Sequence, residues 1–184
     1  INSDRDDYEP RVSADGQSLF FVRGKAGGGA DIYTCNSQPG GWSEPQALAG
    51  VNSDRDDLGP APSADGQSLY FYSDREGGLG GYDLWLARRG PDGWRTPINL
   101  GPSVNSPFND YGPAIAPDGD TLLFASNRPK PGEETPPADG WTATLREEFN
   151  HRDYDLYSAA VNDAGFDRAA PLLALNTLHN EGAP

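Results

Sequence analysis

The sequence is poor in sulfur and in positive charge. Among 184 residues there are one cysteine, no methionine and two histidines. A single cysteine excludes an intrachain disulfide framework and a cysteine-based zinc site. Lysine and arginine number 14 against 28 aspartate and glutamate, a net charge of −14, which argues against binding to nucleic acid or to an anionic membrane surface, because both need a basic patch.

Long apolar runs are also missing. The longest, such as residues 122–125, are far too short to cross a membrane as a helix. The chain opens on Ile1 without the charged and apolar regions of a signal peptide. We therefore expect a processed product or a piece of a larger protein, so the lack of a signal peptide says nothing about compartment.

What the sequence does contain is an internal repeat. Residues 1–23 and 51–73 align without a gap and are identical at 15 of 23 positions. A third copy begins at Val104-Asn105-Ser106, and a fourth begins at Leu175-Asn176-Thr177 and stops at Pro184. Self-similarity at a period of about 50 residues indicates a repeat architecture. The strand pattern within each copy then indicates which architecture it is.

Each copy predicts four short antiparallel strands. An Asp-Gly turn joins a strand near 10–13, 60–63 or 113–116 to a dense apolar strand at 19–22, 69–72 or 122–125. The dense strands barely alternate, which is typical of strands covered on both faces. A third strand follows a glycine-rich loop, and a fourth opens on Gly-Trp or Gly-Phe and ends near Leu48, Leu100 and Leu173. Pro45 and Pro97 suit an edge strand there.

Four strands every 50 residues or so, without helical periodicity, predict an all-β fold of β-propeller blades. The chain forms a single partial propeller over 1–184. Blade 1 covers about 1–50, blade 2 about 51–103, and blade 3 about 104–174 with an insert at 129–152; residues 175–184 start blade 4. Because closed propellers need roughly four to eight blades, further blades of a larger chain, or a second copy, are expected to close the ring.

The motif Pro-x-x-Ser-x-Asp-Gly-x-x-Leu-x-Phe, followed by Ser73-Asp74-Arg75 and by Asp83-Leu84-Trp85, resembles the WD40-like (PD40) repeat of TolB-type propellers. The Val-Asn-Ser-x-x-Asp-Asp variant between blades resembles repeats of bacterial envelope proteins, some with an OmpA-like domain. The resemblance implies a periplasmic or extracellular location in the bacterial envelope. It implies a non-catalytic protein-binding or scaffold role.

The acidic segment between blades is the first candidate site. In propeller geometry its copies should ring one mouth of the central channel, where carboxylates suit a hard cation such as Ca²⁺ or a basic partner segment. The alternative is structural: these side chains accept hydrogen bonds from backbone N–H groups, and equal repetition favours it. The residues are Asp6, Asp7, Asp56, Asp57, Asn109, Asp110, Asn180 and Glu181.

Other reactive side chains receive structural interpretations. Arg75 and Arg128, with Lys25 at the corresponding position, are expected to form ion pairs with the aspartates that open the third strands, Asp31, Asp83 and Asp155. Cys35 takes the place of an alanine in other copies and is expected to be a small buried residue. The sequence offers no catalytic constellation, no metal site and no cofactor motif beyond the Ca²⁺ hypothesis.

The insert is the one feature that does not repeat, and long loops on a rigid scaffold often carry binding specificity. Trp141, Arg146, Phe149 and His151 are the predicted partner contacts. The leading function is a module that binds a protein segment or a glycan. Two alternatives stay open: an accessory or substrate-gating propeller of a hydrolase, such as a serine peptidase or glycosidase, and a cation-stabilised structural propeller.

Overall fold

The computed structural model describes residues 1–130 and 153–181, which contain fifteen strands and no helix. Blade 1 consists of β1 (Asp7–Val12), β2 (Ser18–Arg23), β3 (Asp31–Gln38), β4 (Gly41–Trp42) and β5 (Gln46–Ala47). Blade 2 consists of β6 (Asp57–Pro62), β7 (Ser68–Ser73), β8 (Asp83–Gly90), β9 (Gly93–Trp94) and β10 (Ile98–Asn99). Blade 3 consists of β11 (Asp110–Ile115), β12 (Thr121–Ser126), β13 (Asp155–Asn162), β14 (Gly165–Phe166) and β15 (Ala170–Pro171). Among these residues no helix offers a membrane-spanning segment.

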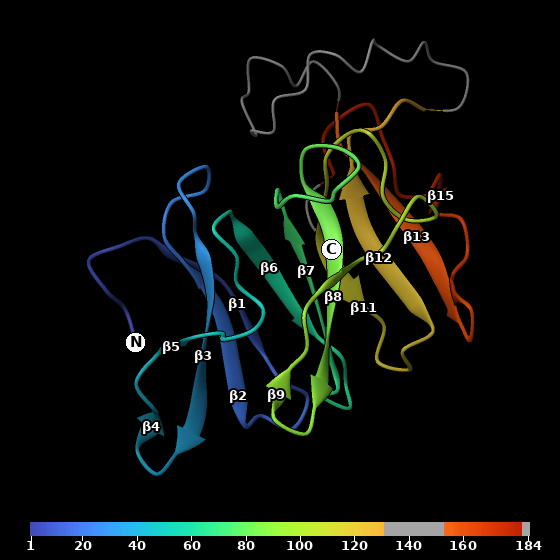
Figure 1. The fold of residues 1–184 in the computed structure, drawn as a ribbon. Helices are drawn as coiled ribbons and strands as arrows, with labels where there is room; N and C mark the ends of the chain where they lie inside the picture. Colours follow the sequence, from blue (N-terminus) through green and yellow to red (C-terminus); the bar gives the residue numbers. More distant parts are fainter. Residues whose placement is uncertain (131–152, 182–184) are drawn as a thin grey trace.

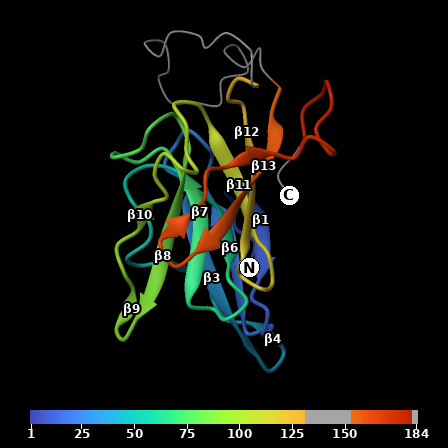
Figure 2. The ribbon, with the colours of Figure 1, turned by 90° about the vertical axis from the view of Figure 1, so that its right-hand side faces the viewer.

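The three sheets are antiparallel and stand side by side, which confirms the predicted all-β fold of four-stranded blades (Figure 1). Among the first strands of the blades, β6 lies between β1 and β11 and contacts both. The short strands β9 and β10 lie on the other side of blade 2 (Figure 2). Each blade therefore runs from an inner strand to an outer one, as in a propeller.

The fourth strand of each blade is broken into two short pieces, which refines the sequence prediction. In blade 1 both β4 and β5 pair with β3, and Pro45 stands in the gap between them. Proline has no N–H to donate to β3, so the ladder lapses there. The last ladder bond of blade 3 comes from the N–H of Leu172, 2.8 Å from the Leu156 carbonyl. Leu172, not Leu173, thus matches Leu48 and Leu100.

The Asp-Gly turns have the predicted conformation. Gly16, Gly66 and Gly119 have φ of 71°, 67° and 81°, a region that glycine enters without steric cost. In the first copy the Gly16 N–H donates to the Ser13 carbonyl at 2.8 Å, and the Ser13 N–H donates to the Ser18 carbonyl at the same distance. The turns therefore fix the hairpin register in all three blades.

The core consists of two layers between the blades. One layer packs Phe20 and Ile32 of blade 1 against Phe71 and Trp85 of blade 2. The other joins blade 2 to blade 3, and includes Leu84, Leu122 and Phe124. Every residue of β7 is buried, which explains why this strand shows no alternation of polar and apolar side chains.

Candidate functional site: the connector face

The loops between β2 and β3 and between β7 and β8 lie at one end of the blades (Figure 1). The connectors, residues 48–56, 100–109 and 172–181, lead from each blade toward the next and bring their acidic segments to this end; residues 1–6 hold the same place before blade 1. We call this end the connector face. It carries all eight residues of the predicted acidic rim.

Each connector begins its polar motif with an asparagine that binds the third strand of the preceding blade. Its Nδ2 donates to the carbonyl of one strand residue, and its Oδ1 accepts from the N–H of the same residue, at 2.8–3.1 Å. The pairs are Asn52 with Ile32, Asn105 with Leu84, and Asn176 with Leu156. The repeated asparagine motif pointed to these residues, but their role depends on a contact across 20 or 21 residues that the sequence does not display.

The last acidic residue of the motif closes a local turn. Asp110 accepts from the N–H and the hydroxyl of Ser106 at 2.6 and 2.9 Å. Asp7 and Asp57 do the same with the serine four residues earlier, and Glu181 does so with Thr177. Side chains of this type favour such turns because their oxygens substitute for backbone acceptors.

The same carboxylates hold the arginines, which corrects the predicted ion pairs. Arg75 binds Asp57 and not Asp83. Arg128 binds Asp110 at 2.5 Å and not Asp155. The reason is geometric: the aspartate that ends the connector and the one that opens the third strand flank the same second-strand residue on opposite sides, and the guanidinium reaches only the former.

In blade 1 the cation comes from a different sequence position. Arg23 Nε lies 2.7 Å from Asp7 Oδ1, so Arg23, two residues before the aligned Lys25, makes the ion pair. Its guanidinium carbon lies 5.3 Å and 4.9 Å from the ring centroids of Phe21 and Tyr33. Arg75 and Arg128 lie over the matching aromatic pairs of their own blades, so the cation–π site is preserved while the residue that fills it moves.

The first acidic residue of the motif links neighbouring blades. Asp56 accepts hydrogen bonds from the N–H groups of Gly27, Gly29 and Ala30 in the glycine-rich loop of blade 1. It also accepts from the Tyr82 hydroxyl at 2.6 Å. The amides Asn109 and Asn180 accept from the N–H of Tyr82 and Tyr154 in the same way, at 3.1 and 2.8 Å. The side chain of Asp6 makes no bond of this kind with any described residue.

These contacts engage nearly all of the rim carboxylates with donors of the protein itself. Over residues 1–130 and 153–181, no three His, Cys, Asp or Glu side chains converge as metal ligands would. These hydrogen bonds are the ones that the structural alternative predicts, while cation binding at the rim stays a prediction. Cys35 is buried, as expected of a small filler, and burial raises the pKa of its thiol.

Asp83 is the exception among these buried carboxylates. Its Oδ2 accepts from the N–H of Leu79 and from Asn99 Nδ2, the latter at 3.0 Å, but its fully buried Oδ1 has no partner among the described residues. Burial, reinforced by the charge of Asp110, raises the pKa of Asp83 to about 6. The matching Asp155 of blade 3 has the Lys130 ammonium 3.1 Å away.

The inner strands β1, β6 and β11 share an irregularity that was not predicted from the sequence. At the bulge of each inner strand the backbone is left-handed: φ is 51° at Glu9, 59° at Gly59 and 61° at Gly112. Glu9 is the one residue other than glycine with positive φ in the described chain. The other two copies of the repeat have a glycine at this position, so the glutamate in the first copy was the signal that the sequence offered. A residue other than glycine costs energy in this conformation.

Glu9 uses that conformation to join two blades. Its Oε2 accepts from the Gly59 N–H at 2.8 Å, and its Oε1 accepts from the Tyr72 hydroxyl at 2.9 Å. Tyr72 stacks edge-on against Tyr111, with ring centroids 5.8 Å apart. Burial raises the pKa of Tyr111 to about 12, so this phenol stays protonated at neutral pH. The inner side of the blades thus carries protonated tyrosines and one carboxylate group, that of Glu9, which two hydrogen bonds hold in place.

The predicted partner contacts Trp141, Arg146, Phe149 and His151 lie outside the described residues. The chain enters and leaves that segment on the connector face of blade 3. Lys130 Nζ, at its start, binds both Asp155 and the Thr177 carbonyl, the latter at 3.2 Å. The described residues that flank the segment, Lys130 and Tyr154, are thus hydrogen-bonded to the connector of blade 3.

The fold is shared with β-propellers of known structure. A putative TolB from Agrobacterium tumefaciens matches with a TM-score of 0.59 and 23% identity, over 93% of this chain and 50% of that one. TolB from Acinetobacter baumannii matches with a TM-score of 0.57 and 15% identity, over 89% and 31%. The β-propeller domain of the Trilobed protease from Pyrococcus furiosus matches with a TM-score of 0.51 and 12% identity, over 91% and 42%. The chain is thus a set of β-propeller blades, and it spans half or less of the length of these three proteins.

At these identities the similarity concerns the fold alone. No protein-family model matches the chain, and no curated protein matches it in sequence. The class of protein is a β-propeller, and its structural neighbours include both TolB and a protease propeller.

Proposed function

We propose that the chain is part of a non-catalytic protein-binding or scaffold propeller of the bacterial cell envelope. A protein or peptide segment, or a glycan, docks on the connector face through Trp141, Arg146, Phe149 and His151. The envelope location rests on the likeness to TolB and on the repeat motif. Further blades of a longer chain, or a second copy, complete the ring.

The observation that carries the proposal is the anchoring of the insert. Lys130 is bound to Asp155 and to the connector of the same blade. At the other end, the N–H of Tyr154 donates to Asn180. A segment that begins and ends on fixed points of a rigid scaffold suits partner recognition, because binding loses less entropy when the loop ends are already ordered.

Site-directed photo-crosslinking tests this function. A photo-reactive amino acid is placed at Trp141 or Phe149 in the full-length protein, in cells that make it. The matched control carries it at Asp92, an exposed residue of the turn between β8 and β9, at the opposite end of the blades. We expect a discrete adduct from 141 and 149 that Arg146→Glu weakens. Adducts that are equal from position 92, or none from the insert, would contradict the proposal.

A second candidate is an accessory propeller of a hydrolase. The match to the propeller domain of the Trilobed protease favours it. The parent reading frame separates the two candidates: a hydrolase domain in the same chain supports the accessory role, whereas an OmpA-like domain or a propeller alone supports the envelope scaffold.

A further inference from the structure

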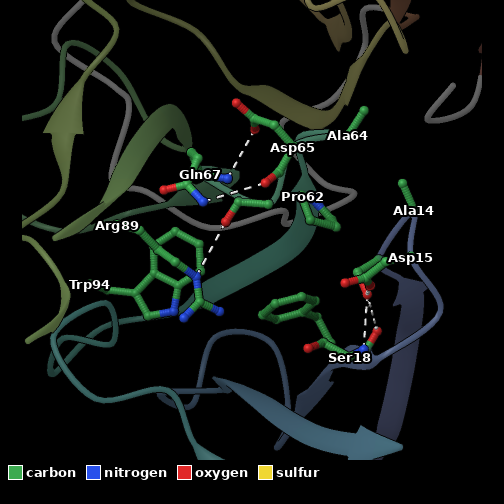
Figure 3. A pocket seen from close by; sticks show the side chains of 12 residues that line it. Ala14, Asp15, Ser18, Pro62, Ala64, Asp65, Gln67, Arg89 and Trp94 are labelled. Atoms are coloured by element: carbon green, nitrogen blue, oxygen red, sulfur yellow. Dashed lines mark hydrogen bonds between the residues drawn. The ribbon is translucent and has the colours of Figure 1, made fainter. Parts of the chain in front are cut away.

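A pocket lies between the Asp-Gly turns of blades 1 and 2, at the end of the blades opposite the connector face. Its volume is about 210 Å³. Arg89 and Trp94 of blade 2 form one side, and Asp15 of blade 1 faces them from the other (Figure 3). The nearly fully buried ring of Phe20 also lines the pocket. A recess that combines aromatic side chains with a few convergent polar groups is typical of small-ligand sites.

The repeat lets the residues of this pocket be compared with their counterparts between blades 2 and 3. Strand pairing places Trp94 opposite Arg89 in blade 2, and Phe166 opposite Val161 in blade 3. Between blades 2 and 3, Phe166 meets Tyr70 edge-on, with ring centroids 6.4 Å apart. Phe20, which matches Tyr70, makes no ring contact with Trp94 in the described structure. Arg89 lies over the Trp94 ring instead, 4.7 Å from its centroid.

The polar groups of the pocket are held in place with part of their capacity unused. Asp15 Oδ1 accepts from the Ser13 hydroxyl at 2.6 Å and from the Gln17 N–H at 2.9 Å, which leaves Oδ2 as a fixed acceptor. Arg89 Nε donates to the Gly66 carbonyl at 3.2 Å. Its two Nη groups bind nothing else within the described ranges, so they remain available as donors.

The net charge of the pocket lining is only −1, although the chain as a whole carries −14. Asp15 and Asp65 contribute two negative charges to the lining, and Arg89 one positive charge. Arg88, the preceding residue, acts electrostatically on Asp65. A lining of net charge −1 does not favour an anion, and ion pairs at exposed positions are weak. The pocket therefore favours a neutral ligand with both donors and acceptors.

We propose that this pocket binds a neutral sugar ring of a glycan. The C–H face of the ring packs on the part of Trp94 that lines the pocket, because the negative face of an aromatic ring attracts polarised C–H groups. Hydroxyl groups donate to Asp15 Oδ2 and accept from the Nη groups of Arg89. This site goes beyond the proposed function, since it lies on the other face and does not use the insert.

Nuclear magnetic resonance titration tests the proposal on the 184-residue chain. The probes are methyl β-glucoside and the methyl glycoside of N-acetylglucosamine, each raised to tens of millimolar. The Trp94 indole N–H signal is identified by its loss in Trp94→Phe. We expect this signal and the Gly66 amide to shift with a saturable, millimolar dissociation constant for at least one sugar. Asp15→Asn should weaken binding by about tenfold, since it replaces the free acceptor oxygen.

Two controls keep the test decisive. Trp42→Ala removes the tryptophan at the matching position of blade 1, which does not line the pocket, and should leave sugar binding unchanged. Asp15→Asn preserves the acceptor for Ser13 and Gln17, so its melting temperature should match that of the unchanged chain. Glycine, a zwitterion, and acetate serve as charged probes. The proposal is overturned if neither sugar shifts the Trp94 signal, if Trp42→Ala abolishes the shift, or if glycine or acetate binds as tightly as the sugars.

Discussion

Blade 2 and the two ends of the chain carry the same repeat in different surroundings. At one connector position, Val51 and Val104 are 1% and 0% exposed, whereas Leu175 is 59% exposed. At another, Asp56 accepts four hydrogen bonds and the Asp6 side chain accepts none from the described residues. The stability of a repeat protein is a sum of unit and nearest-neighbour terms. The comparison shows that several repeat residues stabilise the fold only where another blade lies against them.

The largest expected effect is at Asp56. Asp56→Ala leaves three backbone N–H groups of the blade 1 loop and the Tyr82 hydroxyl without their acceptor. Unpaired buried donors are costly, so we expect a loss of about 3 kcal/mol in the free energy of unfolding, measured by urea denaturation. Asp6→Ala, at the same position of the repeat, should change it by less than about 0.5 kcal/mol. Equal losses at the two positions would show that the motif acts within its own blade.

A smaller difference in unfolding free energy is expected between two asparagines at the same position of the repeat. Asn105→Ala removes both hydrogen bonds to Leu84, which are buried, and the partly buried bond to Asn99 Oδ1. We expect a loss of about 2 kcal/mol in unfolding free energy. Asn176→Ala removes the two equivalent bonds to Leu156 at the partly exposed end of the chain, where water can replace them. Its loss should be about half as large, and a loss equal to that of Asn105→Ala would contradict the role assigned to the next blade.

Much of this fold could be predicted from the sequence because the same pattern of turns and strands occurs in three copies of the repeat. The Asp-Gly turns, the unalternating second strands and the blade architecture were predicted from residues that act within one hairpin. The ion pairs of Arg75 and Arg128 were not, because two carboxylates flank the same strand and only side-chain reach decides between them. Glu9 was missed for a related reason: its bonds to Gly59 and Tyr72 cross to the next blade, 50 and 63 residues along the chain.

The pH dependence of stability at Asp83 gives a further test of the comparison between blades. Its pKa is raised from 3.8 to about 6 in the folded chain, so the folded state binds more protons than the unfolded one between these values. Stability therefore falls as the pH rises through this window, and the full penalty persists at neutral pH. Asp83→Asn should raise the melting temperature by roughly 2–5 °C at pH 7.5, and the gain should disappear below about pH 4.

Asp155→Asn is the matched control for that measurement. Asp155 occupies the same position of blade 3 but faces Lys130. The substitution removes this ion pair, so no gain in melting temperature is expected at pH 7.5. An equal gain from both substitutions would show that burial alone sets the penalty and that the cation in blade 3 does not offset it.

The smallest effect on stability is expected at Leu175. Its side chain is already exposed to solvent, as are those of Leu173 and Leu178 nearby, so Leu175→Ser should change the unfolding free energy of the 184-residue chain by less than about 0.5 kcal/mol. Val104→Ser, at the buried equivalent, should cost about 2 kcal/mol. In a longer chain whose next blade covers Leu175, the serine substitution should cost as much as it does at Val104. If the two costs still differ there, the next blade does not lie against this connector as blades 2 and 3 lie against theirs.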